Sequence, residues 1–277
     1  MVDTASLLDD LRAENADLDR LVDRLGPAGW AAPTPAEGWT VAHQIAHLAW
    51  TDTWALASLT DPAGFPDRVR AASRTQPSRV DDGASEGARR ASTDLLAVWR
   101  AGREELLGAL ASAPADVRLP WFGPPMKPAS LATARIMETW AHGQDVADAL
   151  GADRVPTARL RHIAHLGVRT GDFAFLTHGR PAPTDPVRVE LTGPDGESWT
   201  WGPPDAVDRV TGPALDFCLL ATRRRHRDDL ALTATGPLAH AWLPLAQTYA
   251  GPPGPGRRPL REGWFAPRDT ALGGITR

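Results

Sequence analysis

The chain has 277 residues, of which 42% are hydrophobic and 23% charged, a composition typical of a globular protein with room for one large or two modest domains. Its net charge is −4 and its arginines are scattered, which argues against the concentrated basic face that nucleic-acid binding needs. Cys218 is the single cysteine, which excludes an intrachain disulfide and a cysteine-based zinc cluster, so any metal must be held by histidine and carboxylate side chains.

The start of the chain and its hydropathy predict a cytoplasmic protein. The N-terminal stretch MVDTASLLDDLRAENADL is acidic and lacks the basic start and apolar run of a signal peptide. The sequence contains no apolar window of the length that a membrane span needs. We therefore expect neither a membrane partner nor a nucleic-acid partner.

Four amphipathic segments in the first part of the chain predict a helical bundle. They cover residues 4–25, about 40–59, roughly 84–112 and 130–150. Thr40 and Ser130 are suitable N-caps, and Gly151 is a suitable stop signal. A polar stretch, 74–87, precedes the third segment. Four helices of this length joined by loops fit a four-helix bundle, in which ligand sites form between facing helices.

The periodicity changes beyond a fifth helical segment at about 156–177. Residues 187–202 (VRVELTGPDGESWTWG) alternate as two short strands around a Pro-Asp-Gly turn, which predicts a β-hairpin. Two helical segments, 212–226 and 239–251, then flank a strand-like segment at 229–236. The prediction is a mainly α protein with three parts: a helical bundle domain over 1–180, a smaller α+β domain over 181–255, and a Pro/Gly/Arg-rich tail over 256–277.

The fourth helix places four ionisable residues on one stripe: Arg135, Glu138, His142 and Asp145. Glu138 and His142 stand one turn apart, with about 6 Å between their Cβ atoms, so both side chains can reach one ion. A stripe of this kind inside a bundle is costly unless its members are paired or bind a metal. The alternative is a solvated face with Arg135–Glu138 and His142–Asp145 as surface pairs.

The second helix carries His43 and His47 one turn apart, with Trp50 and Trp54 on the same side. The two imidazoles can chelate one ion as a His-x-x-x-His pair. The alternative is that they are core histidines whose hydrogen bonds are satisfied within the fold.

The stretches EGWTVAHQIAHLAWTD, 37–52, and METWAHGQDVADALG, 137–151, resemble the DinB-like metal-binding bundles. More narrowly, they resemble the N-terminal domain of the mycothiol-dependent maleylpyruvate isomerase branch. The chain is most similar to a subgroup of that branch described only as metal-binding proteins of unknown activity, and this similarity covers nearly the whole chain. The similarity to the isomerases themselves is firm only around the metal motifs.

The resemblance implies a divalent metal, usually Zn2+, held by His47, Glu138 and His142. His43 is not carried over as a ligand, because the family has an acidic or other polar residue at its position. Three roles are open for His43: a fourth ligand, a residue that contacts the ligands without touching the metal, or a surface residue. Asp145 orients His142 or a metal-bound water, or is a surface carboxylate. Arg135 steers an anionic substrate or pairs with Glu138.

Three protein ligands leave one coordination position open, which is typical of a catalytic metal site. The relatives favour a mechanism in which the metal binds a low-molecular-weight thiol, mycothiol, and lowers its pKa. The thiolate then attacks a small electrophile, which makes the protein a thiol transferase or isomerase. The alternatives are a hydrolase or lyase that uses metal-bound water and a non-catalytic protein that binds metal or a small ligand. We expect a small-molecule substrate and a monomer or homodimer.

Further groups are weaker candidates. Trp121, Phe122 and Met126, in the loop before the fourth helix, either roof the substrate pocket or cap the bundle core. His162 and His165 favour a packing or surface role over a second metal pair. The basic run 223–227 is a solvated helix end, or it contacts an anionic substrate or thiol held between the domains. Cys218 lies among apolar residues, as an inert buried thiol does.

Overall fold

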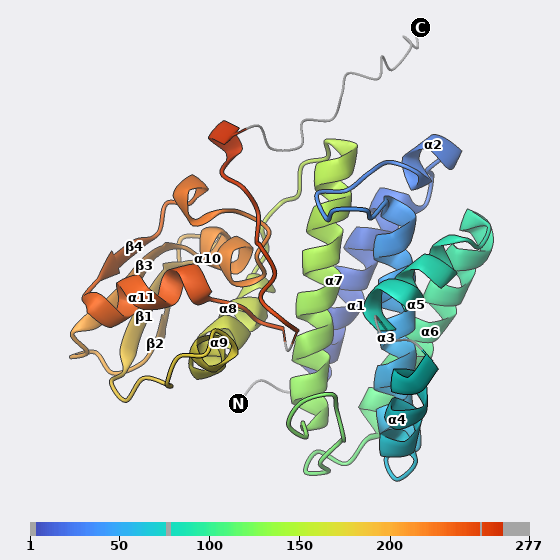
Figure 1. Ribbon diagram of the computed structural model, residues 1–277, viewed down its shortest axis with the longest axis horizontal. Helices are drawn as coiled ribbons and strands as arrows, with labels where there is room; N and C mark the ends of the chain where they lie inside the picture. Colours follow the sequence, from blue (N-terminus) through green and yellow to red (C-terminus); the bar gives the residue numbers. More distant parts are fainter. Residues whose placement is uncertain (1–3, 76–78, 250, 263–277) are drawn as a thin grey trace, which may run out of the picture.

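The structure is a computed structural model that describes residues 4–75, 79–249 and 251–262. Figure 1 shows a bundle of long helices beside a smaller unit in which short helices pack on a sheet. This arrangement confirms the predicted mainly α fold with a small C-terminal α+β part. The boundaries proposed at residues 180 and 255 stay predictions. Within the described ranges, no helix has both the length and the apolar character needed to span a bilayer.

The four long helices of the bundle are the four that the sequence predicts. They are α1 (Thr4–Val22), α3 (Val41–Thr60), α6 (Ser92–Ser112) and α7 (Pro128–Leu150). Three shorter helices join them: α2 (Pro27–Trp30), α4 (Phe65–Thr75) and α5 (Arg79–Ala88). Helix α7 begins with Pro128 at a position where no backbone N–H is needed, and it ends at Gly151 in the left-handed conformation, with φ of 63°.

The predicted start of the third helix at residue 84 is wrong, because the polar stretch before it is largely helical. Helix α5 covers residues 79–88, and a tight turn separates it from α6. Helix α5 packs on α3 through small residues. A Cβ atom on Gly87 would lie 2.7 Å from Ala46 Cβ, and one on Gly83 would lie 2.7 Å from Trp50 Cδ1. The buried side of this helix consists of glycine and alanine, and its one large apolar residue, Val80, is exposed, so its sequence is typical of a loop.

The predicted helix at 156–177 is two helices, α8 (Leu160–Arg169) and α9 (Gly171–Thr177). They meet at Thr170, whose hydroxyl donates to the carbonyl oxygen of Gln247 at 2.7 Å. This bond ties the junction to a segment almost eighty residues further along the chain, which periodicity cannot reveal.

The C-terminal unit contains a four-stranded sheet in the order β2-β1-β3-β4. Its strands are β1 (Val187–Thr192), β2 (Ser198–Trp201), β3 (Asp208–Pro213) and β4 (Thr233–Thr235). The predicted hairpin is confirmed, since β1 and β2 pair antiparallel with Val189 opposite Trp201. Strand β3, which the sequence analysis did not predict, pairs parallel with β1 and antiparallel with β4.

The two predicted C-terminal helices are shorter than expected. The first is α10 (Ala214–Ala221), and the second is α11 (Pro237–Trp242), which continues as a 3-10 turn, η2 (Leu243–Leu245). Asp208 Oδ1 accepts the backbone N–H groups of Leu238 and Ala239 at 2.7 and 3.0 Å and so caps α11 from the adjacent strand. Two further 3-10 turns are η1 (Arg227–Asp229) and η3 (Leu260–Glu262). Residues 263–277 of the predicted tail lie outside the described residues.

The hydrophobic core runs from the bundle into the C-terminal unit without a break. One cluster of buried side chains contains residues of α1, α6, α7, α8, α10, α11 and the sheet, among them Leu11, Ile136, Ile163, Phe217 and Trp242. A second cluster fills the other end of the bundle around Trp99. The C-terminal unit is therefore packed on α7 and α8 as part of one folded body.

A buried carboxylate fixes α1 to the segment that joins α7 to α8. Glu14 accepts hydrogen bonds from Arg154 at 2.6 Å and from Arg159 at 2.7 Å, and its side chain is only 1% exposed. Such a network leaves uncompensated buried charge when one member is removed.

Replacing Glu14 with glutamine is therefore expected to lower the free energy of unfolding by about 3–5 kcal/mol, because Arg154 and Arg159 lose the charge of their shared buried partner and only Arg159 keeps a second carboxylate, Asp17. Urea unfolding followed by circular dichroism measures this loss. Asp116→Asn is the control. It removes the exposed Lys127–Asp116 pair and should leave the unfolding midpoint unchanged. Equal effects of the two substitutions would contradict the role given to Glu14.

Candidate metal centre

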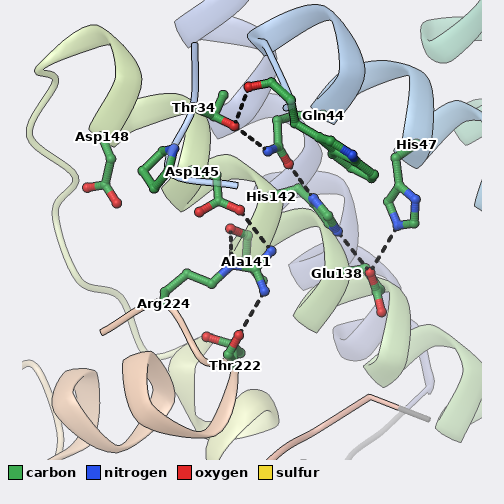
Figure 2. Close-up of polar contacts among 12 residues, drawn as sticks. Thr34, Gln44, His47, Glu138, Ala141, His142, Asp145, Asp148, Thr222 and Arg224 are labelled. Atoms are coloured by element: carbon green, nitrogen blue, oxygen red, sulfur yellow. Dashed lines mark hydrogen bonds and ion pairs between the residues drawn. The ribbon is translucent and has the colours of Figure 1, made fainter. Parts of the chain in front are cut away.

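His47, Glu138 and His142 converge between α3 and α7, as Figure 2 shows. His47 Nε2 lies 3.5 Å and His142 Nε2 lies 3.3 Å from Glu138 Oε2. One donor atom of each residue lies within 4.8 Å of the other two, a spacing that suits a single cation. The expected trio thus faces one point, with His47 buried and the other two half-buried.

The donor set fits a divalent metal. Two imidazoles and one carboxylate are the ligands of one group of catalytic zinc sites. The buried Nδ1 atom of His47 has no hydrogen-bond partner among the described residues. The other ring nitrogen, Nε2, faces Glu138, so the protein gives this buried ring no hydrogen bond that would keep Nε2 from binding a cation.

The electrostatics of the site favour the protonation states that bind metal. Burial lowers the pKa of His142 to about 4, and the positive charges of His47 and Arg224 act in the same direction. Burial alone raises the pKa of Glu138, but its contacts with His142 and His47 hold that pKa well below the usual range. At neutral pH the site therefore offers a neutral imidazole and a carboxylate, as metal binding requires.

Two residues that the sequence analysis did not single out border the ligands. The ring centroid of Trp39 lies 5.4 Å from that of His47 and 6.0 Å from that of His142. Gln44, which is fully buried, places Oε1 2.5 Å from His142 Nδ1. Gln44 precedes His47 by three residues, so both lie on one face of α3. That spacing is the only signal in the sequence that could have found it.

His43 lies outside the cluster of donor atoms. Its Nδ1 accepts the backbone N–H of Thr40 at 3.3 Å and lies 2.8 Å from the Thr40 hydroxyl oxygen, which together form a capping box at the start of α3. His43 therefore caps the helix that carries His47. A role of His43 in supporting the metal stays a prediction.

Arg135 pairs with Asp52 and not with Glu138. Its Nε donates to Asp52 Oδ1 at 2.9 Å, and both side chains are buried. Burial raises the pKa of Asp52, and the neighbouring Arg135 opposes that rise. The pair joins α7 to α3 inside the bundle. Arg135 thus has a structural position, whereas the sequence predicted that it steers substrate or pairs with Glu138.

Asp145 is bound by two arginines of the C-terminal part of the chain. Arg224 Nη2 lies 3.0 Å from Oδ2 and Arg257 Nη2 lies 2.6 Å from Oδ1, while the carboxylate is 1% exposed. Figure 2 shows Arg224 between Asp145 and the backbone oxygens of Ala141 and Thr222. Neither oxygen of Asp145 has a hydrogen bond with His142 among those found in the described residues.

The basic run at 223–227 is a junction and not a solvated helix end. Arg225 forms two bonds with Asp148, at 2.8 and 2.7 Å, beside the Arg224–Asp145 pair. Arg223 adopts the left-handed conformation, with φ of 58°, which is uncommon for a residue other than glycine. Its buried Nε has no hydrogen-bond partner in the described part of the chain. The residue follows the end of α10, where the N–H groups of Arg223 and Arg224 donate to the carbonyl oxygens of Leu220 and Leu219 at 2.8 Å each, so its conformation is that of a helix C-terminal turn.

The remaining candidates lie apart from the donor atoms. Trp121 and Phe122 pack with Phe65, and Phe122 also packs with Trp54 on α3; Met126 pairs with Leu119 across the loop. His162 Nε2 lies 2.7 Å from Asp10 Oδ2, and His165 Nδ1 accepts the indole N–H of Trp201 at 3.2 Å. Cys218 is fully buried, and burial raises the pKa of its thiol far above the ordinary value.

Fold and site together define a DinB-like helical bundle with an inter-helix His/Glu/His cluster. A family model described as the mycothiol maleylpyruvate isomerase N-terminal domain matches residues 11–147, and one described as wyosine base formation matches residues 183–235. The chain belongs to the DinB-like family, in its mycothiol-dependent maleylpyruvate isomerase branch.

Two curated relatives and two solved structures are similar to this chain. Two proteins from strains of Mycobacterium tuberculosis, both named only as uncharacterized proteins, are 54% identical over 257 residues, which is 93% of this chain and all of theirs. The crystal structure of a mycothiol-dependent maleylpyruvate isomerase superposes with a TM-score of 0.58 at 16% identity, covering 84% of this chain and 93% of that one. A histidine-to-alanine mutant of that enzyme matches equally well. At this identity the likeness establishes the fold.

Two carboxylates of α7, Asp145 and Glu138, are expected to respond in different ways to removal of their charge. Asp145→Asn leaves Arg224 and Arg257 unpaired, so it should lower the free energy of unfolding by about 3 kcal/mol while zinc affinity stays near that of the wild type. Glu138→Gln should reduce zinc affinity by more than the roughly 10–100-fold that loss of an outer partner costs, with little loss of stability. Urea unfolding and competition with a chromogenic chelator measure the two quantities. A large loss of zinc affinity in folded Asp145→Asn would instead place Asp145 in the site.

Proposed function

We propose that this chain is a metal-dependent enzyme of the thiol-transferase or isomerase type. It holds a divalent cation, Zn2+ first among the candidates, through His47, Glu138 and His142, and it uses a low-molecular-weight thiol such as mycothiol as cosubstrate. The observation that carries the proposal is the convergence of three donor atoms from two helices within 4.8 Å of one another. Membership of the mycothiol-dependent branch supports the choice of thiol.

The chemistry follows from the open position that three protein ligands leave. A cation held by His47, Glu138 and His142 would lower the pKa of a bound thiol and so make that thiol a nucleophile at neutral pH. That thiol must come from outside the chain, because Cys218 is the only cysteine of the sequence and is fully buried. Addition of the thiolate to an electrophilic double bond, followed by elimination, isomerises the substrate, whereas a stable adduct is the product of a transferase.

The chain's own residues prepare the site for this reaction. Trp39 lies against both imidazoles and limits their exposure to water. Arg224 lies near enough for its positive charge to lower the pKa of His142. Arg223, whose Nε has no hydrogen-bond partner among the described residues, is the group we propose to bind a negative charge on the substrate or thiol. Positive charge beside the site also favours a thiolate over a thiol.

Metal analysis tests the site itself. Purified wild-type protein should retain one zinc ion per chain after dialysis, and the variants His47→Ala and Glu138→Ala should lose it. His162→Ala is the matched control, because His162 is also half-buried and also contacts a carboxylate. Equal zinc content in His47→Ala and the wild type would rule out the trio as the metal site.

Thermal unfolding with added mycothiol tests the choice of cosubstrate. The midpoint should rise on addition of the thiol only when the protein is metal-loaded, because a ligand stabilises the state to which it binds. Cysteine and glucosamine, added separately as fragments of such a thiol, serve as comparisons. A metal-loaded protein that responds to neither mycothiol nor cysteine favours metal-bound water and a hydrolase or lyase.

Arg223→Ala is expected to raise the KM for an anionic substrate or thiol by about tenfold or more while kcat changes little, because loss of one charge-assisted hydrogen bond costs roughly 1.5–3 kcal/mol. Arg261→Ala provides the control, since Arg261 is exposed and pairs with Asp228. An unchanged KM in Arg223→Ala would remove Arg223 from the substrate site.

A further inference from the structure

A chain of hydrogen bonds leads from the backbone of Trp39 to the ring of His142. Figure 2 shows its part from Thr34 through Gln44 to His142. The Thr34 hydroxyl oxygen lies 2.9 Å from the carbonyl oxygen of Trp39, and Gln44 Nε2 lies 2.8 Å from the same hydroxyl. Gln44 Oε1 then lies 2.5 Å from His142 Nδ1. Gln44 is fully buried and Thr34 is 5% exposed, so bulk water does not offer either side chain other partners.

The carbonyl oxygen of Trp39 fixes which group donates and which accepts in every hydrogen bond of this series. A backbone carbonyl only accepts, so the hydroxyl proton of Thr34 must point to Trp39. The oxygen of Thr34 can then only accept from Gln44, which turns the amide NH2 toward Thr34 and Oε1 toward His142. The reverse orientation of the amide would draw the hydroxyl proton to Gln44 and leave two bare oxygen atoms 2.9 Å apart. An amide oxygen also only accepts, so the proton of a neutral His142 ring lies on Nδ1.

We propose that Gln44 is a positioning residue that fixes the tautomer of His142. With the proton on Nδ1, the lone pair of Nε2 points toward Glu138 Oε2, 3.3 Å away, and is free to bind a cation. Without Gln44, the proton of the His142 ring could lie on Nε2, and this N–H would donate a hydrogen bond to Glu138. Two of the three ligands would then bind each other, and their atoms would not be free for a cation. The assignment of the tautomer rests on hydrogen bonds alone; its consequence for metal binding rests on the proposed function.

This series of hydrogen bonds also distinguishes His142 from His47. His142 has an assigned partner at Nδ1, whereas Nδ1 of His47 has none in the part of the chain that the structure describes. In the metal-free protein, a proton facing Glu138 therefore comes from His47. Partners of this kind, which contact ligands and not the metal, commonly change metal affinity by 10–100-fold when they are removed.

Nitrogen-15 NMR of histidine-labelled, metal-free protein tests the tautomer directly. Spectra are recorded at about pH 8, above the ordinary histidine pKa of about 6.5, so that the imidazoles are neutral. The signals of His142 are assigned from their loss in His142→Ala. The expected result is a protonated Nδ1 and a bare Nε2 in the wild type, and a proton shifted to Nε2 in Gln44→Met. A wild-type His142 with its proton on Nε2 would overturn the proposal without recourse to any variant.

Zinc affinity, measured by chelator competition, tests the consequence. Gln44→Met should weaken zinc binding by about 10–100-fold, and Gln44→Glu, which keeps an acceptor facing Nδ1, should restore most of it. Gln144→Met is the matched control, because Gln144 is a half-buried glutamine on the metal helix that donates to Asp148 at 2.9 Å. It should bind zinc as the wild type does.

The outcomes separate the two proposals. A protonated Nδ1 in a wild-type protein that binds no zinc would refute the metal-dependent function and leave the tautomer assignment intact. Zinc affinity that is equal in Gln44→Met and the wild type would refute the positioning role while the function stands. If Gln44→Met does not fold, Thr34→Val replaces it. That variant frees the amide to rotate and should weaken zinc binding and mix the two tautomers.

Discussion

The packing of α3 against α7 sets one imidazole of the first helix beside a carboxylate and an imidazole of the second. Each helix supplies an incomplete set of donors, so the site exists only where the two helices touch. The buried Arg135–Asp52 pair lies at the same contact. It holds the two helices in one register, since sliding either helix by a turn would strand both charges in the core. Fold and candidate chemistry thus depend on the same interface.

Much of this arrangement could be predicted from the sequence, because periodicity is a local property. The four long helices and the β1–β2 hairpin follow from apolar spacing and turn residues. The spacing of Glu138 and His142 also shows that they share a face of one helix. The choice of His47 over His43 needed the family resemblance, since both residues lie on a similar side of α3. The structure adds a physical reason, because the ring of His43 is occupied by the cap of its own helix.

The rest depends on contacts between residues far apart in the sequence. Asp145 lies on the same stripe as His142, which suggested a shared role, yet its partners Arg224 and Arg257 come from distant segments. Gln44 is an ordinary polar residue until the connector at Thr34 folds back over it. Helix α5 was missed because glycine and alanine make its contact with α3. In each case the deciding partner could not be identified from local spacing.

The ion pairs of Asp145 with Arg224 and Arg257 limit how the bundle and the C-terminal unit can move relative to each other. Arg257 reaches both Asp145 on the metal helix and the carbonyl oxygen of Pro35 in the connector before α3, so a single side chain spans three parts of the fold. Any hinge opening between the bundle and the C-terminal unit would break ion pairs on a carboxylate with no access to water. A bulky cosubstrate would therefore have to enter through the rearrangement of side chains and loops at the rim, with the two halves staying together as a rigid body.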